Sequence, residues 1–275
     1  MTYEQFYGLK ENPFGVTPDP RFFFSSKSHQ DALAYLRYTL GERKGFAVVT
    51  GEVGVGKTTV VKRFVETLNG GVDLAVVLNP KLSFKQLLAT IARELGFAVK
   101  GKNKADLLLD LKDFLVEARR RDRSVVLIVD EAQNLPASSL EEIRMLSNLE
   151  MESSKLLQIA FVGQPELSDM LNLKSLRQLR QRIPGICTIG PLSKQDVEQY
   201  VKTRLEKAGS EGGAPEFSQE AFEEIFRYSG GIPRLINFVC DRSLLLGFVE
   251  EARNVDERLV RAAVKDLEGI QEVLT

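Results

Sequence analysis

Residues 51–58 (GEVGVGKT) fit the pattern G-x-x-x-x-G-K-[ST]. Glycines in such a loop let successive backbone N–H groups point at a phosphate, and the helix that follows adds positive potential. Lys57 is then placed to neutralise the β- and γ-phosphates, and the Thr58 hydroxyl is placed to ligate Mg²⁺. The pattern predicts a nucleotide phosphate site made of Gly51, Glu52, Val53, Gly54, Val55, Gly56, Lys57, Thr58 and Thr59.

Two adjacent carboxylates, Asp130 and Glu131, follow the apolar run 125–129. Asp130 fits a residue that binds Mg²⁺ either directly or through a water molecule bound to the ion. Glu131 fits the group that orients and deprotonates an attacking water. A small-molecule kinase does not need this second acid, whereas an ATP hydrolase does. The pair therefore favours hydrolysis over the alternative that Glu131 only caps the next helix.

Side-chain amides end two other apolar runs. Gln164 follows residues 156–162 and could reach both the γ-phosphate and the water, although an ordinary turn glutamine is the alternative. Asn79 follows residues 74–78 and could hold Glu131 in an inactive orientation. Asn-Pro is also a common turn, so the two interpretations of Asn79 stand equal.

Arginines gather in the segment 176–183 (LRQLRQRI), where Arg177, Arg180 and Arg182 are candidates. One of them could reach the γ-phosphate of a neighbouring subunit and make hydrolysis depend on assembly, with Arg182 favoured over Arg180. The alternative is a solvated helix face. Arg234 follows Pro233 at a helix start and could reach back to the nucleotide; a simple helix start is the alternative.

Two further features have weaker functional interpretations. His29 lies near the start of a helix, where local packing or capping is favoured and a place in the nucleotide pocket is the alternative. The run 119–123 (RRRDR) ends a helix, where cations favour the helix dipole. A solvated helix end is favoured over contact with a nucleic acid or an acidic partner.

The elements that must position these residues alternate between strand and helix up to residue 190. Apolar runs predict strands at 45–50, 74–78, 125–129, 156–162 and 185–189. Helical patterns fall between them, and possible capping boxes predict helices at 83–95, from Ser83 and Gln86, and at 139–151, from Ser139 and Glu142. This alternation implies a parallel α/β sheet with helices on both faces.

After Pro191 the patterns are helical only, at 193–208, 218–228, 233–248 and 256–268. We therefore expect two domains: residues 1–190, an N-terminal arm plus an α/β phosphate-loop domain, and residues 191–275, an all-helical lid. The arm holds five of the 16 phenylalanines (Phe6, Phe14, Phe22, Phe23 and Phe24), so we expect it to be ordered.

Composition limits the other possibilities. Lys and Arg total 37 against 38 Asp and Glu, so the chain is not a polybasic wrapper of nucleic acid. One histidine and two cysteines without CxxC spacing argue against a zinc site or a disulfide framework. No apolar run has the length of a membrane span and no signal peptide precedes the first element, so a cytoplasmic location is expected.

Together these motifs resemble the AAA+ ATPases. The finer match is to the general secretion pathway protein A type, through FYGLKENPF at 6–14, TPDP at 17–20, TGEVGVGKT at 50–58, DEAQNL at 130–135 and VGQPEL at 162–167. Transposition ATPases of the TniB/MuB kind are near relatives. The resemblance implies the strand order 5-1-4-3-2, with Gln164 as sensor 1, Arg182 or Arg180 as the finger acting on a neighbour, and Arg234 as sensor 2. It also implies Asn79 as the switch partner of Glu131.

The function expected from the resemblance is ATP hydrolysis with Mg²⁺ at subunit interfaces of a ring or filament. The energy of ATP hydrolysis would drive assembly or remodelling of a bacterial envelope system for secretion, pilus formation or polysaccharide export. The alternative is an ATP-dependent, DNA-binding regulator of transposition. The near-neutral charge and the arm favour the first. Any membrane tie would come from a partner protein.

Overall fold

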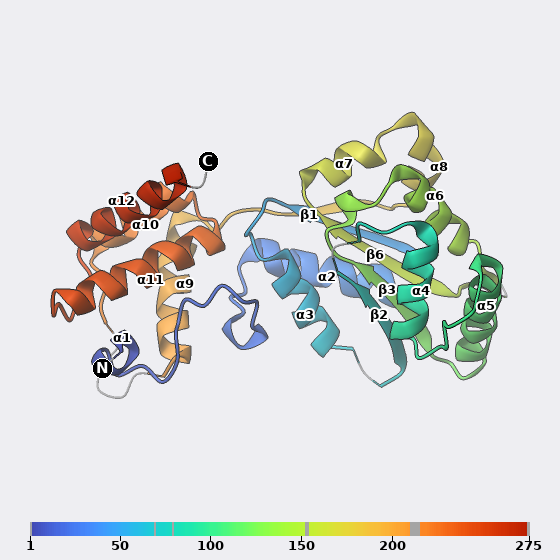
Figure 1. Cartoon of the computed structure of the whole chain (residues 1–275), viewed down its shortest axis with the longest axis horizontal. Coiled ribbons are helices and arrows are strands. Elements are labelled where there is room, and N and C mark those ends of the chain that lie inside the picture. The colour runs from blue at the N-terminus through green and yellow to red at the C-terminus, as the bar shows by residue number, and fades with distance from the viewer. Residues whose placement is uncertain (1, 69, 79, 152–153, 210–214, 274–275) are drawn as a thin grey trace. The chain divides into compact units, whose positions relative to one another are not determined.

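The computed structural model describes residues 2–68, 70–78, 80–151, 154–209 and 215–273 (Figure 1). Contacts divide the chain into two units. One, the sheet unit, comprises Lys27–Val53 and Val60–Ile189. The other, the helical unit, comprises Met1–Ser26, Gly54–Thr59 and Gly190–Thr275. The sequence grouped the arm with the α/β domain, whereas contacts group it with the helices; the two-domain division at residue 190 itself stays a prediction.

Among the described residues of the sheet unit, five parallel strands form a sheet in the order β2-β3-β6-β1-β7. They are β1 (Phe46–Gly51), β2 (Val72–Val77), β3 (Ser124–Val129), β6 (Leu157–Gly163) and β7 (Ile186–Ile189). Counting these strands alone from one to five gives 5-1-4-3-2, which confirms the order expected from the resemblance. The central strands are buried along their length because both faces are covered.

Helices lie before and between these strands. They are α2 (Lys27–Gly41), α3 (Lys57–Glu66), α4 (Phe84–Glu94), α5 (Lys104–Arg120), α6 (Ala137–Leu146), α7 (Pro165–Leu171) and α8 (Arg177–Arg180), with 3-10 turns η2 (Ala132–Asn134) and η3 (Lys174–Leu176). The first turn of one of them, α3, belongs by its contacts to the helical unit. The predicted capping box of Ser83 and Gln86 is present at the start of α4. Strand residues and helix residues share one continuous apolar core.

The predicted helix 139–151 is wrong at both ends. Helix α6 begins at Ala137 after Pro136, and Ser139 is a buried residue inside it rather than its cap. Pro136 is the N-cap residue, with φ −58° and an extended ψ of 145°, and its backbone oxygen accepts from the Ser139 and Leu140 N–H groups, so the first turn forms before Ser139 can act as a cap. The chain leaves the helix after Leu146 and pairs β4 (Glu150–Met151) with β5 (Ser154–Lys155) in an antiparallel ladder.

In the part of the helical unit that the structure describes, four long helices pack around a second core. They are α9 (Lys194–Lys207), α10 (Gln219–Ser229), α11 (Pro233–Val249) and α12 (Glu257–Val273), preceded by α1 (Tyr3–Phe6) and the 3-10 turn η1 (Pro20–Phe22) of the arm. Arm side chains enter that core: Tyr3, Tyr7, Leu9, Phe14 and Phe22. The arm is therefore ordered, as expected: Tyr3, Tyr7, Phe14 and Phe22 are buried against helices, and Phe6 and Phe24 are partly buried against the same core.

A buried arginine joins the arm to α9. Arg204 is 7% exposed and donates to the backbone oxygens of Pro13 and Gly15, the latter at 3.2 Å. It also donates to the Tyr200 hydroxyl at 2.9 Å, and its guanidinium lies 4.7 Å from the centroid of the Phe22 ring. One side chain thus satisfies arm carbonyls and covers an arm aromatic ring.

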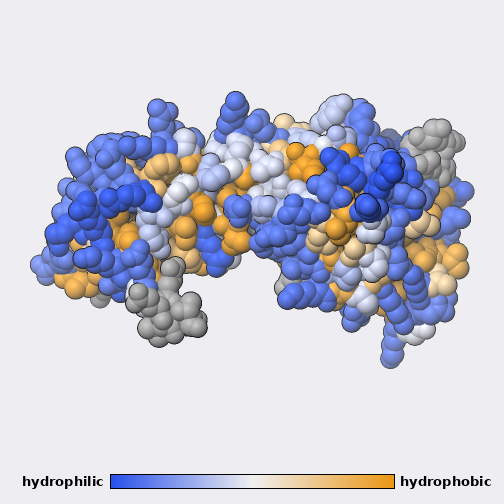
Figure 2. All heavy atoms as spheres, turned by 90° about the horizontal axis from the view of Figure 1, so that it is seen from above, coloured by the Kyte–Doolittle hydropathy of each residue, from blue (hydrophilic) through white to orange (hydrophobic). Residues whose placement is uncertain are grey.

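The face seen in Figure 2 is mostly hydrophilic, with smaller apolar patches between. This agrees with a composition in which 27% of residues are charged. None of the helices in the described part of the chain is long and apolar enough to cross a membrane.

Candidate nucleotide and catalytic site

The predicted phosphate loop has the backbone that its glycines allow. Strand β1 ends at the buried Gly51, and α3 begins at Lys57. Between them Gly54 and Gly56 have φ of 85° and 101°, values that residues with a Cβ rarely adopt. Val55 is fully buried and anchors the loop, whereas Glu52 and Val53 are exposed.

Lys57, Thr58 and Thr59 form the first turn of α3. Lys57 is only 6% exposed, whereas lysine side chains are almost never buried unless they are paired. Both threonines are half-buried. A glycine-lined loop ahead of a helix N-terminus, with a buried cation in the first turn, fits the triphosphate of a nucleotide.

Arg234 lies against the phosphate loop within the helical unit. Its backbone N–H donates to the Gly54 oxygen at 3.2 Å. A Cβ at Gly54 would come 2.7 Å from the Arg234 Cβ and 3.1 Å from Ile232, so only glycine fits. The guanidinium lies 5.6 Å from the Phe238 ring centroid, at the start of α11. The structure therefore brings Arg234 to the loop, and its sensor role stays a prediction.

The carboxylates and the amide meet at the carboxyl edge of the sheet. Strands β3 and β6 are neighbours, with Val129 opposite Phe161, so the residues that follow them lie together. Gln164 caps α7, and its Nε2 donates to Oε2 of Glu131 at 3.2 Å. Asp130 is 3% exposed and accepts from the Glu131 backbone N–H at 2.9 Å.

Glu131 has a left-handed backbone, with φ 54° and ψ 38°. This conformation costs a residue with a Cβ roughly 1–2 kcal/mol, and such strain concentrates at functional sites. It ends the extended path of β3 and starts the 3-10 turn η2. The observation favours a functional position for the Glu131 carboxylate over a mere helix cap, since Glu131 makes no side-chain cap hydrogen bond.

Gln133 belongs to the same cluster, although the motifs did not single it out. Its Nε2 donates to Oε2 of Glu131 at 2.6 Å, and its Oε1 accepts from the Gln164 backbone N–H at 3.1 Å. A polar amide two residues after the carboxylate pair was the available signal. No spacing rule marks it, because the contact depends on the left-handed turn at Glu131.

The structure does not bring the arginine candidates to this cluster. Arg182 donates to the buried Ser147 hydroxyl at 3.0 Å, and Arg180 donates to the Ile183 oxygen at 3.3 Å. Arg177 is exposed, and its side chain makes no hydrogen bond or ion pair within the described part of the chain. To act on a neighbouring subunit, Arg182 or Arg180 has to leave the contact it makes here.

Other candidates are placed as follows. His29 is 4% exposed near the start of α2, and its assignment to the nucleotide pocket stays a prediction. Asn79 lies outside the described residues. In the run 119–123, Arg121 pairs with Glu117 at 2.8 Å and Arg123 pairs with Asp73 at 2.6 Å, which favours a solvated helix end.

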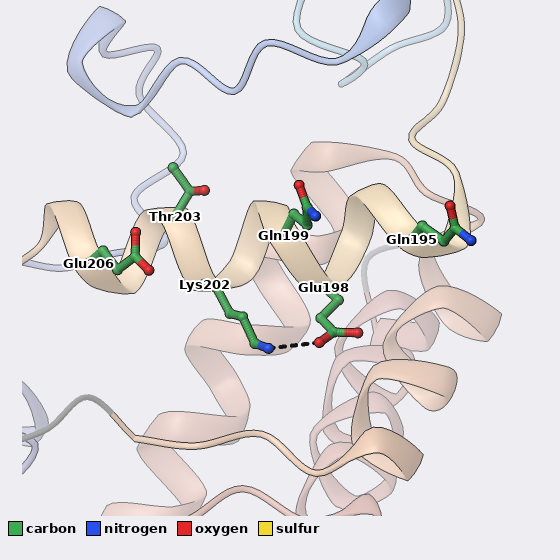
Figure 3. A pocket seen from close by; sticks show the side chains of 6 residues that line it. All are labelled: Gln195, Glu198, Gln199, Lys202, Thr203 and Glu206. Carbon is green, nitrogen blue, oxygen red and sulfur yellow. Dashed lines mark hydrogen bonds and ion pairs between the residues drawn. The ribbon is translucent and has the colours of Figure 1, made fainter.

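A hollow on α9 lies outside the predicted site (Figure 3). The side chains that line it all come from this one helix: Gln195, Glu198, Gln199, Lys202, Thr203 and Glu206. Lys202 pairs with Glu198 at 2.7 Å, so its charge is already compensated. These contacts are those of a solvated helix face.

No three His, Cys, Asp or Glu residues gather in a metal-binding cluster among the residues that the structure describes. The assignment of Thr58 and Asp130 to Mg²⁺ stays a prediction, and it does not require such a cluster, because phosphate oxygens and water complete the shell of Mg²⁺ at nucleotide sites. Both residues offer the oxygen ligands that Mg²⁺ prefers.

Comparisons with known proteins agree with the motifs. Residues 40–171 match the family model of an AAA domain. General secretion pathway protein A of Aeromonas hydrophila is 41% identical over 271 residues, which are 98% of this chain and 49% of that protein. The chain therefore spans about half the length of this relative. ATP-dependent target DNA activator B of Escherichia phage Mu is 29% identical over 47% of this chain and 39% of that protein.

Solved structures show the same fold at lower identity. Cdc6p from Pyrobaculum aerophilum aligns with a TM-score of 0.70 and 20% identity over 90% of this chain and 70% of that chain. The ORC2 protein of Aeropyrum pernix, in its ADPNP–ADP complexes, aligns with a TM-score of 0.66 and 17% identity, covering 90% and 72%. These likenesses confirm the fold class expected from the sequence.

Proposed function

Because this chain belongs to the AAA+ ATPases and is related along nearly its whole length to general secretion pathway protein A, we propose that it binds and hydrolyses ATP. The observation that carries the proposal is the cluster at the carboxyl edge of the sheet. There, a carboxylate at the end of β3 accepts a hydrogen bond from the amide that follows β6. The phosphate loop follows β1, which pairs directly with β6.

Binding is assigned to the loop residues 51–59. Their N–H groups and Lys57 hold the phosphates, and the Thr58 hydroxyl and the Asp130 carboxylate are the oxygen ligands for Mg²⁺. Bound Mg²⁺ would supply compensation for the charge on the β- and γ-phosphates. Arg234, which already contacts the loop backbone, is assigned to the nucleotide through its guanidinium, and His29 is assigned to the same pocket.

Hydrolysis is assigned to Glu131 and Gln164. Glu131 accepts a proton from the water that attacks the γ-phosphorus, and the bond from that phosphorus to the bridging oxygen breaks to give ADP and inorganic phosphate. Gln164 orients the Glu131 carboxylate, to which it is hydrogen-bonded in this structure. A positioned general base contributes typically about 10²–10⁴-fold to a rate.

Self-association completes the site in this proposal. Arg182, or Arg180 in its place, reaches the γ-phosphate bound to a neighbouring subunit of a ring or filament. Because both arginines are engaged within their own subunit here, assembly has to exchange those contacts for the phosphate. Turnover then depends on subunit concentration.

The cellular role we propose is assembly or remodelling of a bacterial envelope complex, such as a secretion, pilus or polysaccharide-export system. The 41% identity to general secretion pathway protein A supports it. The proposal places the chain in the cytoplasm, and a partner protein in that complex would bring it to the inner membrane. Neighbouring genes test the role: secretin or pilus genes support it, and a transposase gene contradicts it.

A second candidate is an ATP-dependent, DNA-binding regulator of transposition, favoured by the similarity to target DNA activator B of phage Mu. Phosphate contacts make DNA affinity fall steeply with salt. Fluorescence anisotropy of a labelled DNA duplex separates the two candidates. The duplex is titrated with the protein in the presence and absence of ATP, at about 50 mM and about 200 mM salt. ATP-dependent, salt-sensitive binding supports the second candidate, and its absence supports the first.

Glu131→Gln tests the hydrolytic assignment, since it keeps the shape of the side chain and removes the base. We expect affinity for a fluorescent ATP analogue to stay within about twofold and turnover to fall by about 100-fold or more. Glu206→Gln is the matched control, because Glu206 is an exposed residue of α9 (Figure 3). Turnover of Glu131→Gln close to that of the unmodified chain would contradict the proposal.

A further inference from the structure

The amide side chain of Gln133 holds two residues that the proposed hydrolysis uses. It donates to Oε2 of Glu131 at 2.6 Å and accepts from the backbone N–H of Gln164 at 3.1 Å. One amide group therefore ties the carboxylate after β3 to the N-terminal residue that caps α7. Both of its hydrogen-bonding atoms are engaged, which fixes its orientation.

The backbone around Gln133 is fixed as well. The left-handed turn at Glu131 leads into η2, and Glu131 donates its N–H to Asp130. On either side of Gln133, Ala132 and Leu135 are 0% and 2% exposed and belong to the core of the sheet unit. A short turn anchored by buried residues at both ends leaves the Gln133 side chain little freedom to move.

Gly163 provides the space that the Gln133 side chain occupies. A Cβ at this position would lie 2.6 Å from Oε1 of Gln133, closer than such atoms approach in real structures. The φ of Gly163 is outside the left-handed region, so its backbone does not require glycine. The Gln133 amide is the nearest obstacle to a side chain at the end of β6, and Leu167, with its Cδ2 at 3.0 Å from the same point, is the next.

The two oxygens of Glu131 have different surroundings. Oε2 accepts from the amides of both Gln133 and Gln164, whereas Oε1 accepts no hydrogen bond from the described residues. One oxygen is held and the other remains open to a water. A base fixed in this way loses less entropy when the reaction begins than a freely rotating carboxylate does.

We propose that Gln133 is a positioning residue for ATP hydrolysis, which sets the orientation of the Glu131 carboxylate and couples it to Gln164. This rests on the proposed function of Glu131 as the base. Gln133 itself touches neither nucleotide nor water in this assignment. Its loss should slow the chemical step while leaving nucleotide binding intact, because the phosphate loop does not depend on it.

The test uses Gln133→Ala, Gly163→Ala and the double variant in the full chain. Gln133→Ala should lower kcat about tenfold or more, the factor expected from one lost hydrogen bond to a charged group, with KM for ATP within about twofold. Gly163→Ala should have a similar effect, since its Cβ displaces the amide. In the Gln133→Ala background it should cost less than it does in the unmodified chain, because the contact with the amide is gone and Leu167, with its Cδ2 at 3.0 Å and its Cβ at 3.3 Å, is the close neighbour that remains.

A readout without nucleotide separates positioning from activity. Backbone amide exchange at Gln164 should accelerate several-fold in Gln133→Ala, because its N–H loses its acceptor. Gln195→Ala, at an exposed residue of α9 seen in Figure 3, is the matched control and should change neither kcat nor this exchange rate.

Each outcome bears on one proposal. An unchanged or increased kcat in Gln133→Ala, a rise in KM without loss of kcat, or additive effects of the two substitutions would overturn the positioning role. Normal turnover by Glu131→Gln would instead overturn the assignment of the base, whatever Gln133→Ala does. Loss of turnover in Glu131→Gln together with normal Gln133→Ala leaves the proposed function standing without the positioning role.

Discussion

Arg204→Met is predicted to release the N-terminal arm from the helices. Methionine keeps an unbranched chain of similar length and removes the guanidinium. That group donates to the oxygen of the buried Pro13, and it covers the ring of Phe22 at 4.7 Å. Gly15 is exposed, so water can replace the donor to its oxygen.

The expected loss follows from these contacts. A hydrogen bond from a charged group contributes about 1.5–3 kcal/mol, and a desolvated cation over an aromatic ring adds about 1–2 kcal/mol. Methionine recovers part of this because its burial carries no charge. A net loss of about 3 kcal/mol raises the population of the opened arm roughly 100-fold.

Hydrogen exchange of the Lys10 amide measures this opening, because its N–H donates to the Ala208 oxygen at the end of α9 at 2.9 Å. Protection at Lys10 should fall roughly 100-fold in Arg204→Met. The matched control is Arg253→Met, which removes an exposed arginine over the Phe6 ring and should cost less than about 1 kcal/mol. Equal protection in the two variants, or unchanged protection in Arg204→Met, would refute the reasoning.

Three other predictions follow from contacts described here. Gly231→Ala should lower the midpoint temperature of unfolding far more than Gly230→Ala does. A Cβ at position 231 would lie 2.0 Å from the Leu192 oxygen, whereas a Cβ at position 230 has no atom within 4 Å. Equal midpoints for the two variants would contradict this. Arg182→Ala should lower turnover, and such subunits should restore little turnover to mixed assemblies with unmodified ones; turnover per subunit that is independent of dilution to nanomolar protein would contradict a shared site. Burial, with the nearby Asp31 charge, raises the pKa of Cys187 above its usual range. Because the thiolate is the reactive form, iodoacetamide should label Cys187 slowly at pH 8 and faster as the pH rises. Labelling of Cys187 at pH 8 at the rate of a free cysteine would refute this prediction.

Local chemistry was enough to predict much of the phosphate loop and of the sheet unit. The glycines at 54 and 56 need left-handed φ, and the structure has it. The Ser83 and Gln86 pair predicted the start of α4 because a capping box is satisfied within four residues. The similar pair at Ser139 and Glu142 gave a wrong prediction, since α6 begins at Ala137, directly after Pro136, and Ser139 therefore lies inside the helix.

Contacts distant in sequence set the limit of prediction. Aromatic residues in the arm indicated burial, but nothing local shows that Tyr3 and Phe14 pack with α9–α12 rather than with the sheet. The sequence alone did not identify Gln133, for a related reason. Its hydrogen bonds to Glu131 and Gln164 exist only because a left-handed turn and a neighbouring strand bring those groups together.

The grouping of Met1–Ser26 with Gly190–Thr275 has a consequence for biosynthesis. The arm is synthesised before the sheet unit, whereas its core partners on α9 to α12 are synthesised after it. At about 5–20 residues per second, the wait from residue 26 to residue 273 is roughly 12–50 seconds. Throughout that time the apolar rings of the arm have no native partner, so a nascent chain of this protein offers a chaperone a defined binding segment.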